Sequence, residues 1–151
     1  MKKLFFVMAL AISSLLCFGQ DTTGRVIFKP VVSDTIALTD QVRGILADKM
    51  VLVCTQNGVE VGESRYVITP DVRVKDKRIT SSIPPKCIVE LDVKLRVVDT
   101  LVHEKISETD ITLTSIESNE AKAIHKAISR MNVRSSQIRK FITVTRKKLE
   151  Q

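Results

Sequence analysis

The side chains that could carry nucleophilic or acid–base chemistry are few, and their positions do not form a catalytic set. Nucleophilic catalysis needs a nucleophile, a base and a group that orients the base, all within hydrogen-bond reach. His103 falls in an expected hairpin turn, and His125 falls in the middle of an expected helix. Cys54 and Cys87 fall on inward-facing apolar positions, whereas a reactive thiol should be partly exposed in a positively charged setting. We therefore predict no catalytic residue.

Metal, cofactor and nucleic-acid sites have no better support in the sequence. The two cysteines lack the spacing of zinc ligands, and there is no calcium loop or phosphate-cradling glycine loop. The carboxylates Glu90 and Asp92 alternate along one expected strand with Lys94 and Arg96, a pattern typical of cross-strand ion pairs. Aromatic side chains are too scattered for base stacking. We predict no metal, no cofactor and no nucleic-acid partner.

The N-terminus has the pattern of a secretory signal. Two lysines at positions 2 and 3 precede a run without charge from Leu4 to Phe18, which is too short for a transmembrane helix. Small residues favour cleavage after Gly19, which predicts a signal peptide over 1–19 and a single domain over 20–151. Acylation of Cys17 is the alternative, and the bulky leucine before that cysteine argues against it. The sequence predicts an exported, periplasmic or secreted protein with no transmembrane segment after cleavage.

Positive charge is concentrated at the C-terminus. The chain has a net charge of +7. Residues 20–129 hold 15 basic and 16 acidic side chains, whereas residues 130–151 hold seven basic side chains and one acidic side chain.

Four cations of the last expected helix form two pairs at a spacing of seven residues, which is nearly two helical turns and places each pair on one side. The pairs are Arg139 with Arg146 and Lys140 with Lys147. Arg139 and Lys140 lie near the helix N-terminus, where the helix dipole disfavours cations. We predict that these four residues contact an anionic partner, either an acidic envelope polymer or an acidic protein face. A solvated basic surface is the alternative.

Alternation and helical periodicity predict the elements that position these side chains. Apolar residues alternate with charged ones most clearly from Cys87 to Val97, so this segment should be a central strand with its odd positions in the core. Other strands are expected over 25–32, 65–74 and about 104–116, and helices over 39–57, over 119–131 and from about 137 to the end. The proline in 25–32 predicts an edge or bulged strand.

The caps and apolar faces of these elements are also predicted. Thr39 should cap the first helix, and Asn57-Gly58 should end it. Ser118 should cap the second helix, whose buried stripe should be Ala121, Ile124, Ala127, Ile128 and Met131. The polar stretch 75–86 ends in Pro84-Pro85, which should stop pairing. The predicted fold is α+β: an antiparallel sheet of three to four strands with about three helices packed on one face.

Three segments carry a resemblance to a known family. They are "IPPKCIVELDVKLRVVD" (83–99), "ITLTSIESNEAKAI" (111–124) and "SSQIRKFI" (135–142), and "TQNGV" (55–59) also fits. From about Gly58 onward the chain resembles a family of small exported proteins of Gram-negative bacteria with no assigned role. Its strand–helix order is loosely similar to envelope-assembly lipoproteins of the curli-secretion and penicillin-binding-protein-activator type. The resemblance implies no site residue, because the family offers none to carry over. The similarity in strand–helix order is at the level of the fold, which does not imply function.

Export, one domain, a basic last helix and the lack of a catalytic set favour an exported, non-enzymatic interaction or assembly module of the cell envelope. Two alternatives stay open: a small hydrolase-type enzyme whose site is not visible in the sequence, and a carrier of a glycan or small ligand. The sequence does not fix the oligomeric state. It favours free thiols at Cys54 and Cys87 over a disulfide between them, without excluding the bond.

Overall fold

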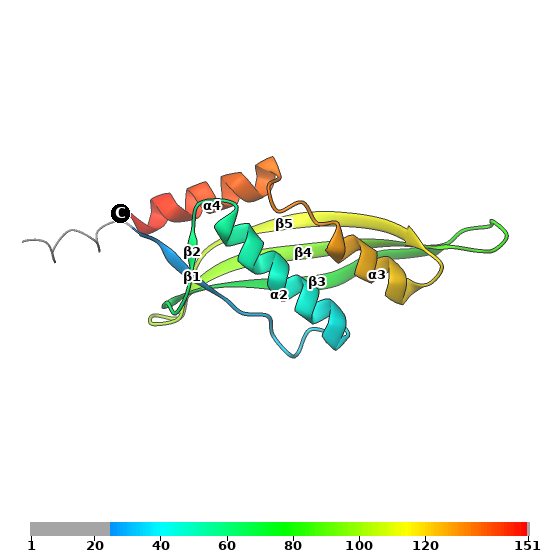
Figure 1. The fold of residues 1–151 in the computed structure, drawn as a ribbon, viewed down its shortest axis with the longest axis horizontal. Helices are drawn as coiled ribbons and strands as arrows, with labels where there is room; N and C mark the ends of the chain where they lie inside the picture. Colours follow the sequence, from blue (N-terminus) through cyan, green and yellow to red (C-terminus); the bar gives the residue numbers. More distant parts are fainter. Residues whose placement is uncertain (1–24, 151) are drawn as a thin grey trace, which may run out of the picture.

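The computed structural model describes residues 25–150, in which three helices cover one face of a five-stranded sheet (Figure 1). The elements in chain order are β1 Ile27–Pro30, α2 Asp40–Thr55, β2 Glu60–Val61, β3 Tyr66–Ile79, β4 Cys87–Asp99, β5 Glu104–Glu117, α3 Glu120–Ser129 and α4 Ser136–Leu149. The predictions for residues 1–19, including cleavage after Gly19 and the alternative at Cys17, lie outside the described residues. No helix between residues 25 and 150 is long and apolar enough to cross a membrane.

Three long antiparallel strands, β3, β4 and β5, make up most of the sheet. β4 pairs with β3 on one side and with β5 on the other. Every odd-numbered residue of β4 from Cys87 to Asp99 is buried, and every even-numbered residue is half-buried. The predicted central strand and its inner face are therefore confirmed.

The prediction of an entirely antiparallel sheet of three to four strands is wrong, because β1 and β2 add two short parallel strands. β1 pairs parallel with β2 on one side and with β3 on the other, so the sheet is mixed, in the order β2-β1-β3-β4-β5. β1 is therefore not an edge strand. The Val26 carbonyl accepts a hydrogen bond from the Glu60 N–H of β2, and the Phe28 carbonyl accepts one from the Gly62 N–H. On the other side, the Val31 N–H donates to the Ile68 carbonyl of β3. Since backbone groups alternate sides along a strand, the nitrogen of Pro30 points to the β2 side, past the end of β2.

The prediction that β3 ends near Val74 is also wrong. Residues 75–79 continue the pairing with β4 as far as Ile79 opposite Cys87, and the ladder shifts register between Val74 and Asp76. Val74, opposite the buried Leu91, is 45% exposed instead of lying in the core. The two prolines lie in the turn between β3 and β4. The β3–β4 hairpin therefore extends past the end of α3 as an arm, defined here as residues 75–86 (Figure 1).

The helix ends follow from specific side chains. The Thr39 hydroxyl accepts a hydrogen bond from Val42 N at 3.3 Å and caps α2 as predicted. Gly58, with φ of +80°, follows the end of α2 as predicted. The cap of α3 differs from the prediction: Asn119, not Ser118, accepts a hydrogen bond from Lys122 N at 2.9 Å. An amide side chain can make the same cap bond as a hydroxyl, which is why two adjacent candidates could not be separated from sequence.

The core lies between the inner face of the sheet and the three helices. α2 and α3 lie across this face, and α4 runs along β5 (Figure 1). In α3, Ala123 is buried and Ala121 is exposed, which corrects one position of the predicted stripe. The largest fully buried side chains come from β1, β3, β4 and the three helices: Phe28, Leu46, Met50, Ile68, Leu91, Leu95, Ile128, Ile138, Ile142, Val53, Val89 and Val93.

Candidate functional site

The candidate nucleophiles and bases are far apart in the described structure. His103 lies in the exposed β4–β5 turn with φ of +54°, and His125 is half-buried on α3. Cys54 and Cys87 are both buried and free. They belong to the C-terminal end of α2 and the start of β4, which lie at opposite ends of the sheet (Figure 1). Within residues 25–150, no group of three His, Cys, Asp or Glu side chains could hold a metal ion.

Of the two carboxylates Glu90 and Asp92 of β4, Glu90 belongs to a lattice of ion pairs on the outer face of the sheet. Asp92 lies opposite Arg73 in the register, without an ion pair among residues 25–150. In the strand register, Lys94 lies between Asp71 of β3 and Asp110 of β5. The Lys94 ammonium lies 3.9 Å from the Asp110 carboxylate, and the Arg96 guanidinium lies 3.8 Å from Asp71. Glu90 pairs with Lys75 at 3.4 Å. Exposed pairs of this kind neutralise charge on a solvated face and contribute little to stability.

The positive charge of the protein is gathered on α3 and α4. Residues 120–150, named here the basic segment, contain nine Lys and Arg residues against Glu120 and Glu150, a net charge of +7. Residues 25–119 contain 13 Lys and Arg residues and 14 Asp and Glu residues, a net charge of −1. α3 and α4 follow one another along the length of the sheet (Figure 1), so this charge is spread along the molecule.

The predicted inner face of α4 holds the helix to the sheet. Ile138, Phe141 and Ile142 are buried as predicted, and Leu149 is half-buried. Thr145 is also fully buried, and its hydroxyl shares a hydrogen bond with the Ser107 hydroxyl of β5 and donates to the Phe141 carbonyl. Sequence reasoning missed this polar contact, because a threonine among cations gives no apolar signal.

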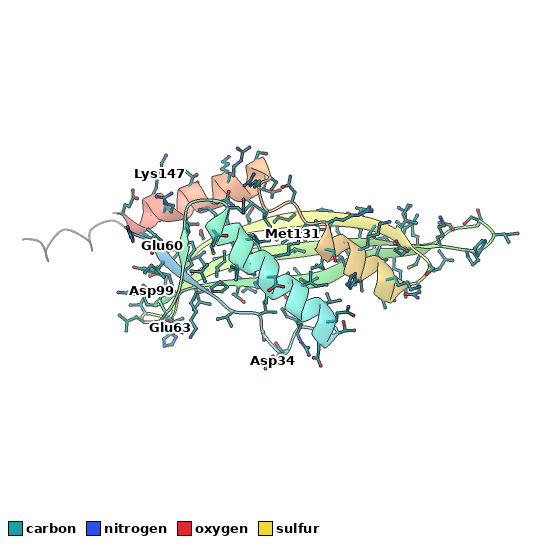
Figure 2. All side chains as sticks on the ribbon, in the orientation of Figure 1. Asp34, Glu60, Glu63, Asp99, Met131 and Lys147 are labelled. Atoms are coloured by element: carbon teal, nitrogen blue, oxygen red, sulfur yellow. The ribbon has the colours of Figure 1, made fainter. Side chains whose placement is uncertain are left out.

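The four predicted contact residues lie on two sides of α4. Lys140 and Lys147 are both exposed and lie opposite the buried stripe of α4, and Lys140 also lines a hollow beside Glu108 of β5. Figure 2 shows Lys147 on the outer surface of the helix. Arg139 and Arg146 lie about a quarter of a turn around the helix axis from the two lysines. Arg139 is exposed, and Arg146 is half-buried. Within the described residues, none of the four has an acidic side chain within 4 Å, and Lys140 and Lys147 have no hydrogen bond through their ammonium groups.

Arg146 reaches the C-terminal end of α2. Its guanidinium lies next to Gly58, where a β-carbon added to the glycine would stand 3.5 Å from the Nη1 atom of Arg146. Arg134 approaches the same helix end and donates from Nε to Gln56 Oε1 at 2.6 Å. The last turn of α2 has no basic residue of its own, so these two arginines place positive charge at the negative end of the helix dipole.

A groove between α2 and α3 was not foreseen from the sequence. Its larger hollow, about 670 Å³, is lined by Thr39, Gln41, Val42, Glu117, Ala121, Lys122, His125, Lys126, Ser129 and Arg130. A smaller hollow of about 330 Å³ shares Thr39, Val42 and Ala121 with it and adds Ala37, Leu38, Glu120 and Ile124. The available signal was the spacing of Lys122, Lys126 and Arg130, which recur every four residues and so lie along one side of α3.

No family model matches the chain, and no curated protein matches it. Solved structures with a similar outline include a minor lipoprotein of Acinetobacter baumannii, at 14% identity and a TM-score of 0.45, covering 80% of this chain and 90% of that one. The PelC dodecamer of Paraburkholderia phytofirmans matches at 13% identity and a TM-score of 0.44, covering 82% and 88%. A DUF330 protein of Xanthomonas campestris matches at 13% identity and a TM-score of 0.45, covering 87% and 91%. Likenesses at this level assign neither a family nor a function to this chain.

Proposed function

We propose that the protein is an exported, non-enzymatic interaction module of the bacterial cell envelope, which binds an anionic partner through the basic segment. The observation that carries the proposal is the charge of residues 120–150, a net +7 beside a body of net −1. Arg139, Lys140 and Lys147 are exposed on α4 and have no acidic neighbour within 4 Å among the described residues. Exposed cations without partners favour association with anions.

A linear polyanion fits this arrangement better than a compact acidic patch. The cations follow α3 and α4 along the length of the sheet, so an extended chain of anionic groups could contact many of them in sequence. Such contacts act mainly through long-range attraction, which salt weakens because the screening length is about 10 Å at 0.1 M and shorter above that. Arg139, Lys140, Arg146 and Lys147 are the proposed contact residues, and Arg146 also supports the end of α2.

The test compares two variants that lose the same number of positive charges, one on α4 and one elsewhere on the protein. A variant with Arg139→Gln, Lys140→Gln and Lys147→Gln leaves the half-buried Arg146 in place. A matched control, Arg73→Gln, Lys75→Gln and Lys86→Gln, removes the same charge from exposed positions of β3 and the arm. We expect the α4 variant to elute from immobilised polygalacturonate at clearly lower salt than both the control and the native protein.

The outcomes are distinguishable. Equal elution of the two variants would show that net charge, not α4, governs retention, and the proposed site would be rejected. Retention of the native protein by an acidic protein from envelope extract but not by the polymer would replace the polyanion with a protein face. Arg146→Gln is measured separately, with its thermal midpoint, because it should also destabilise the end of α2.

Export is part of the proposal and has its own test. The expected mature chain begins at Gln20 and carries no lipid. The intact mass of the protein made in a Gram-negative host should match residues 20–151, and a mass that matches a diacylglyceryl adduct on Cys17 would contradict the proposal.

A further inference from the structure

The groove between α2 and α3 differs in chemistry along its length. Its larger hollow has three basic side chains on one wall, Lys122 and Lys126 of α3 and Arg130 at the C-cap of that helix. Its smaller hollow is mainly apolar, with Leu38, Val42 and Ile124 among its lining. The two hollows share Thr39, Val42 and Ala121, so they form one continuous groove with a cationic end and an apolar end.

Two of the three cations in the groove are free to bind an anion. Lys126 lies 3.2 Å from the Glu117 carboxylate and donates to the Ile116 carbonyl at 3.2 Å. The hydrogen bond from Lys126 lowers the pKa of Glu117 below its ordinary value, so this carboxylate stays ionised and its charge is balanced within the protein. Within residues 25–150, Lys122 and Arg130 have no acidic side chain within 4 Å. The cationic end therefore has about two unbalanced positive charges.

The apolar end has no unbalanced charge. Glu120 lies at its rim, and its carboxylate is 2.9 Å from the Lys77 ammonium of β3. The remaining lining residues are alanines, Leu38, Val42, Ile124 and the capping residue Thr39. Thr39 already accepts the hydrogen bond from Val42 N. An apolar group in this hollow would bury hydrocarbon without leaving a charge unpaired.

We propose that the groove binds a single-chain amphiphilic anion, such as an alkyl carboxylate or alkyl phosphate. The head group lies between Lys122 and Arg130, and the alkyl chain lies toward Leu38 and Ile124. Ligand sites of this kind are mostly apolar with a few placed polar groups, in clefts of about 300–1,000 Å³. Lys122 and Arg130 also belong to the basic segment, so a polyanion could contact them as well. The proposed contact residues of the polyanion lie on α4, however, so the amphiphile site can be present whether or not the polyanion proposal holds.

The test is isothermal titration with dodecanoate and dodecyl phosphate below their critical micelle concentrations, using the complete mature chain. Lys122→Gln with Arg130→Gln should weaken binding by about tenfold or more, since each lost contact is charge-assisted. Lys140→Gln with Lys147→Gln is the matched control, because it removes the same charge from α4 and should change the affinity less than about twofold. Ile124→Asn should weaken alkyl binding while leaving the cations in place.

Ligands that lack one half of the amphiphile test the two ends separately. Inorganic phosphate, with no alkyl chain, and dodecyl maltoside, with no charge, should each bind far more weakly than dodecyl phosphate. Equal losses in the groove and α4 variants would overturn the proposal, and so would native protein that fails to bind either anion. Binding to vesicles of anionic lipid without binding to the monomeric anions would also overturn it, because the site would then be a membrane surface. Circular dichroism and thermal melts identify any variant that fails to fold, in which case Lys122→Gln alone replaces the double variant.

Discussion

Leu91 and Lys94 lie three residues apart on β4 and point to opposite faces of the sheet. Leu91 is fully buried, and Lys94 lies in the outer ion-pair lattice. Leu91→Ala should lower the free energy of unfolding by about 2–5 kcal/mol, because it leaves a cavity between sheet and helices. Lys94→Ala should cost less than about 1 kcal/mol. Urea denaturation of both variants measures the difference, and equal midpoints would show that the faces of β4 are misassigned.

Asp99 joins three segments at the end of β4. Its carboxylate accepts two hydrogen bonds from the Arg65 guanidinium, at 2.9 and 2.6 Å, and one from Leu101 N at 3.0 Å. The Arg65 carbonyl in turn accepts from the backbone and hydroxyl of Thr100. The hydrogen bonds from Arg65 lower the pKa of Asp99 below its ordinary value of 3.8, against the opposing effect of desolvation.

Because the pKa of Asp99 is lowered in the folded state, the free energy of unfolding should decrease at low pH. The carboxylate favours the folded state fully above pH 4 to 5, and this contribution is lost as pH falls from 3.8 through the lower folded pKa. Between pH 6 and pH 3 the native protein should therefore lose more stability than Asp99→Asn. Glu104→Gln, at the exposed position opposite Asp99, is the control and should fall as the native protein does. Parallel curves for the native protein and Asp99→Asn would contradict this expectation.

Cys54 and Cys87 should both be unreactive thiols in the folded protein. Burial makes the Cys54 thiol inaccessible and raises its pKa to about 12. The thiol is therefore neutral at pH 8. A mature chain from residue 20 should give no reaction with Ellman's reagent when folded and two thiols per chain in urea. Zero thiols in urea would reveal a disulfide, and rapid reaction of the folded chain would show that the sites are open.

At the scale of elements, the sequence predicted best where one pattern decided the structure. β4 alternates over 13 residues, and its phase and its start at Cys87 follow from that alternation, whereas its end at Asp99 lies two residues beyond the predicted Val97. β1 could not be placed, because a four-residue strand is positioned by partners, and its partner β2 has only two residues. The end of β3 was misjudged because residues 75–78 are all charged and only Ile79 is apolar, so the local sequence gave no sign of the pairing with β4 that extends the strand.

β5 is an edge strand, and helix side chains cover part of its free side. The ammonium of Lys148 donates to the Ile106 carbonyl at 3.0 Å, and the Gln137 amide donates to the Asp110 carbonyl. The Lys126 ammonium likewise donates to the Ile116 carbonyl, at 3.2 Å. Unpaired strand edges promote association between chains, and lysines that cover them oppose it.

Removal of two of these donors should therefore promote self-association. Gln137→Ala with Lys148→Ala frees two β5 carbonyls while leaving Lys126 and the groove intact. Sedimentation velocity should show a concentration-dependent shift to larger species than the native protein forms. Thr143→Ala with Lys147→Ala, on the exposed side of α4, should sediment as the native protein does. If all three proteins sediment alike, the side chains do not protect the edge.

At the scale of the whole molecule, the candidate sites were only partly predictable. The charge of the last helix can be counted from the sequence, and the helical period placed Lys140 and Lys147 on the outer surface. The role of Arg146 depends on Gly58, which is 88 residues earlier in the chain. The groove likewise needs α2 and α3 side by side. A single sequence indicates which face of each helix or strand is apolar, but it does not indicate which of these faces pack against one another.

The arm has a consequence for how cooperatively the protein unfolds. Residues 75–79 are exposed although they lie in a strand, and Ile83 at the turn is 99% exposed. The contact of these residues with α3 is the exposed ion pair between Lys77 and Glu120. Little apolar surface therefore resists their separation from β4, and this end of the hairpin should open without global unfolding. Amide hydrogen exchange of 76–82 should therefore be much faster than that of 91–97 and nearly independent of urea. Exchange at the same rate in both segments would mean that the arm and the core open as one unit.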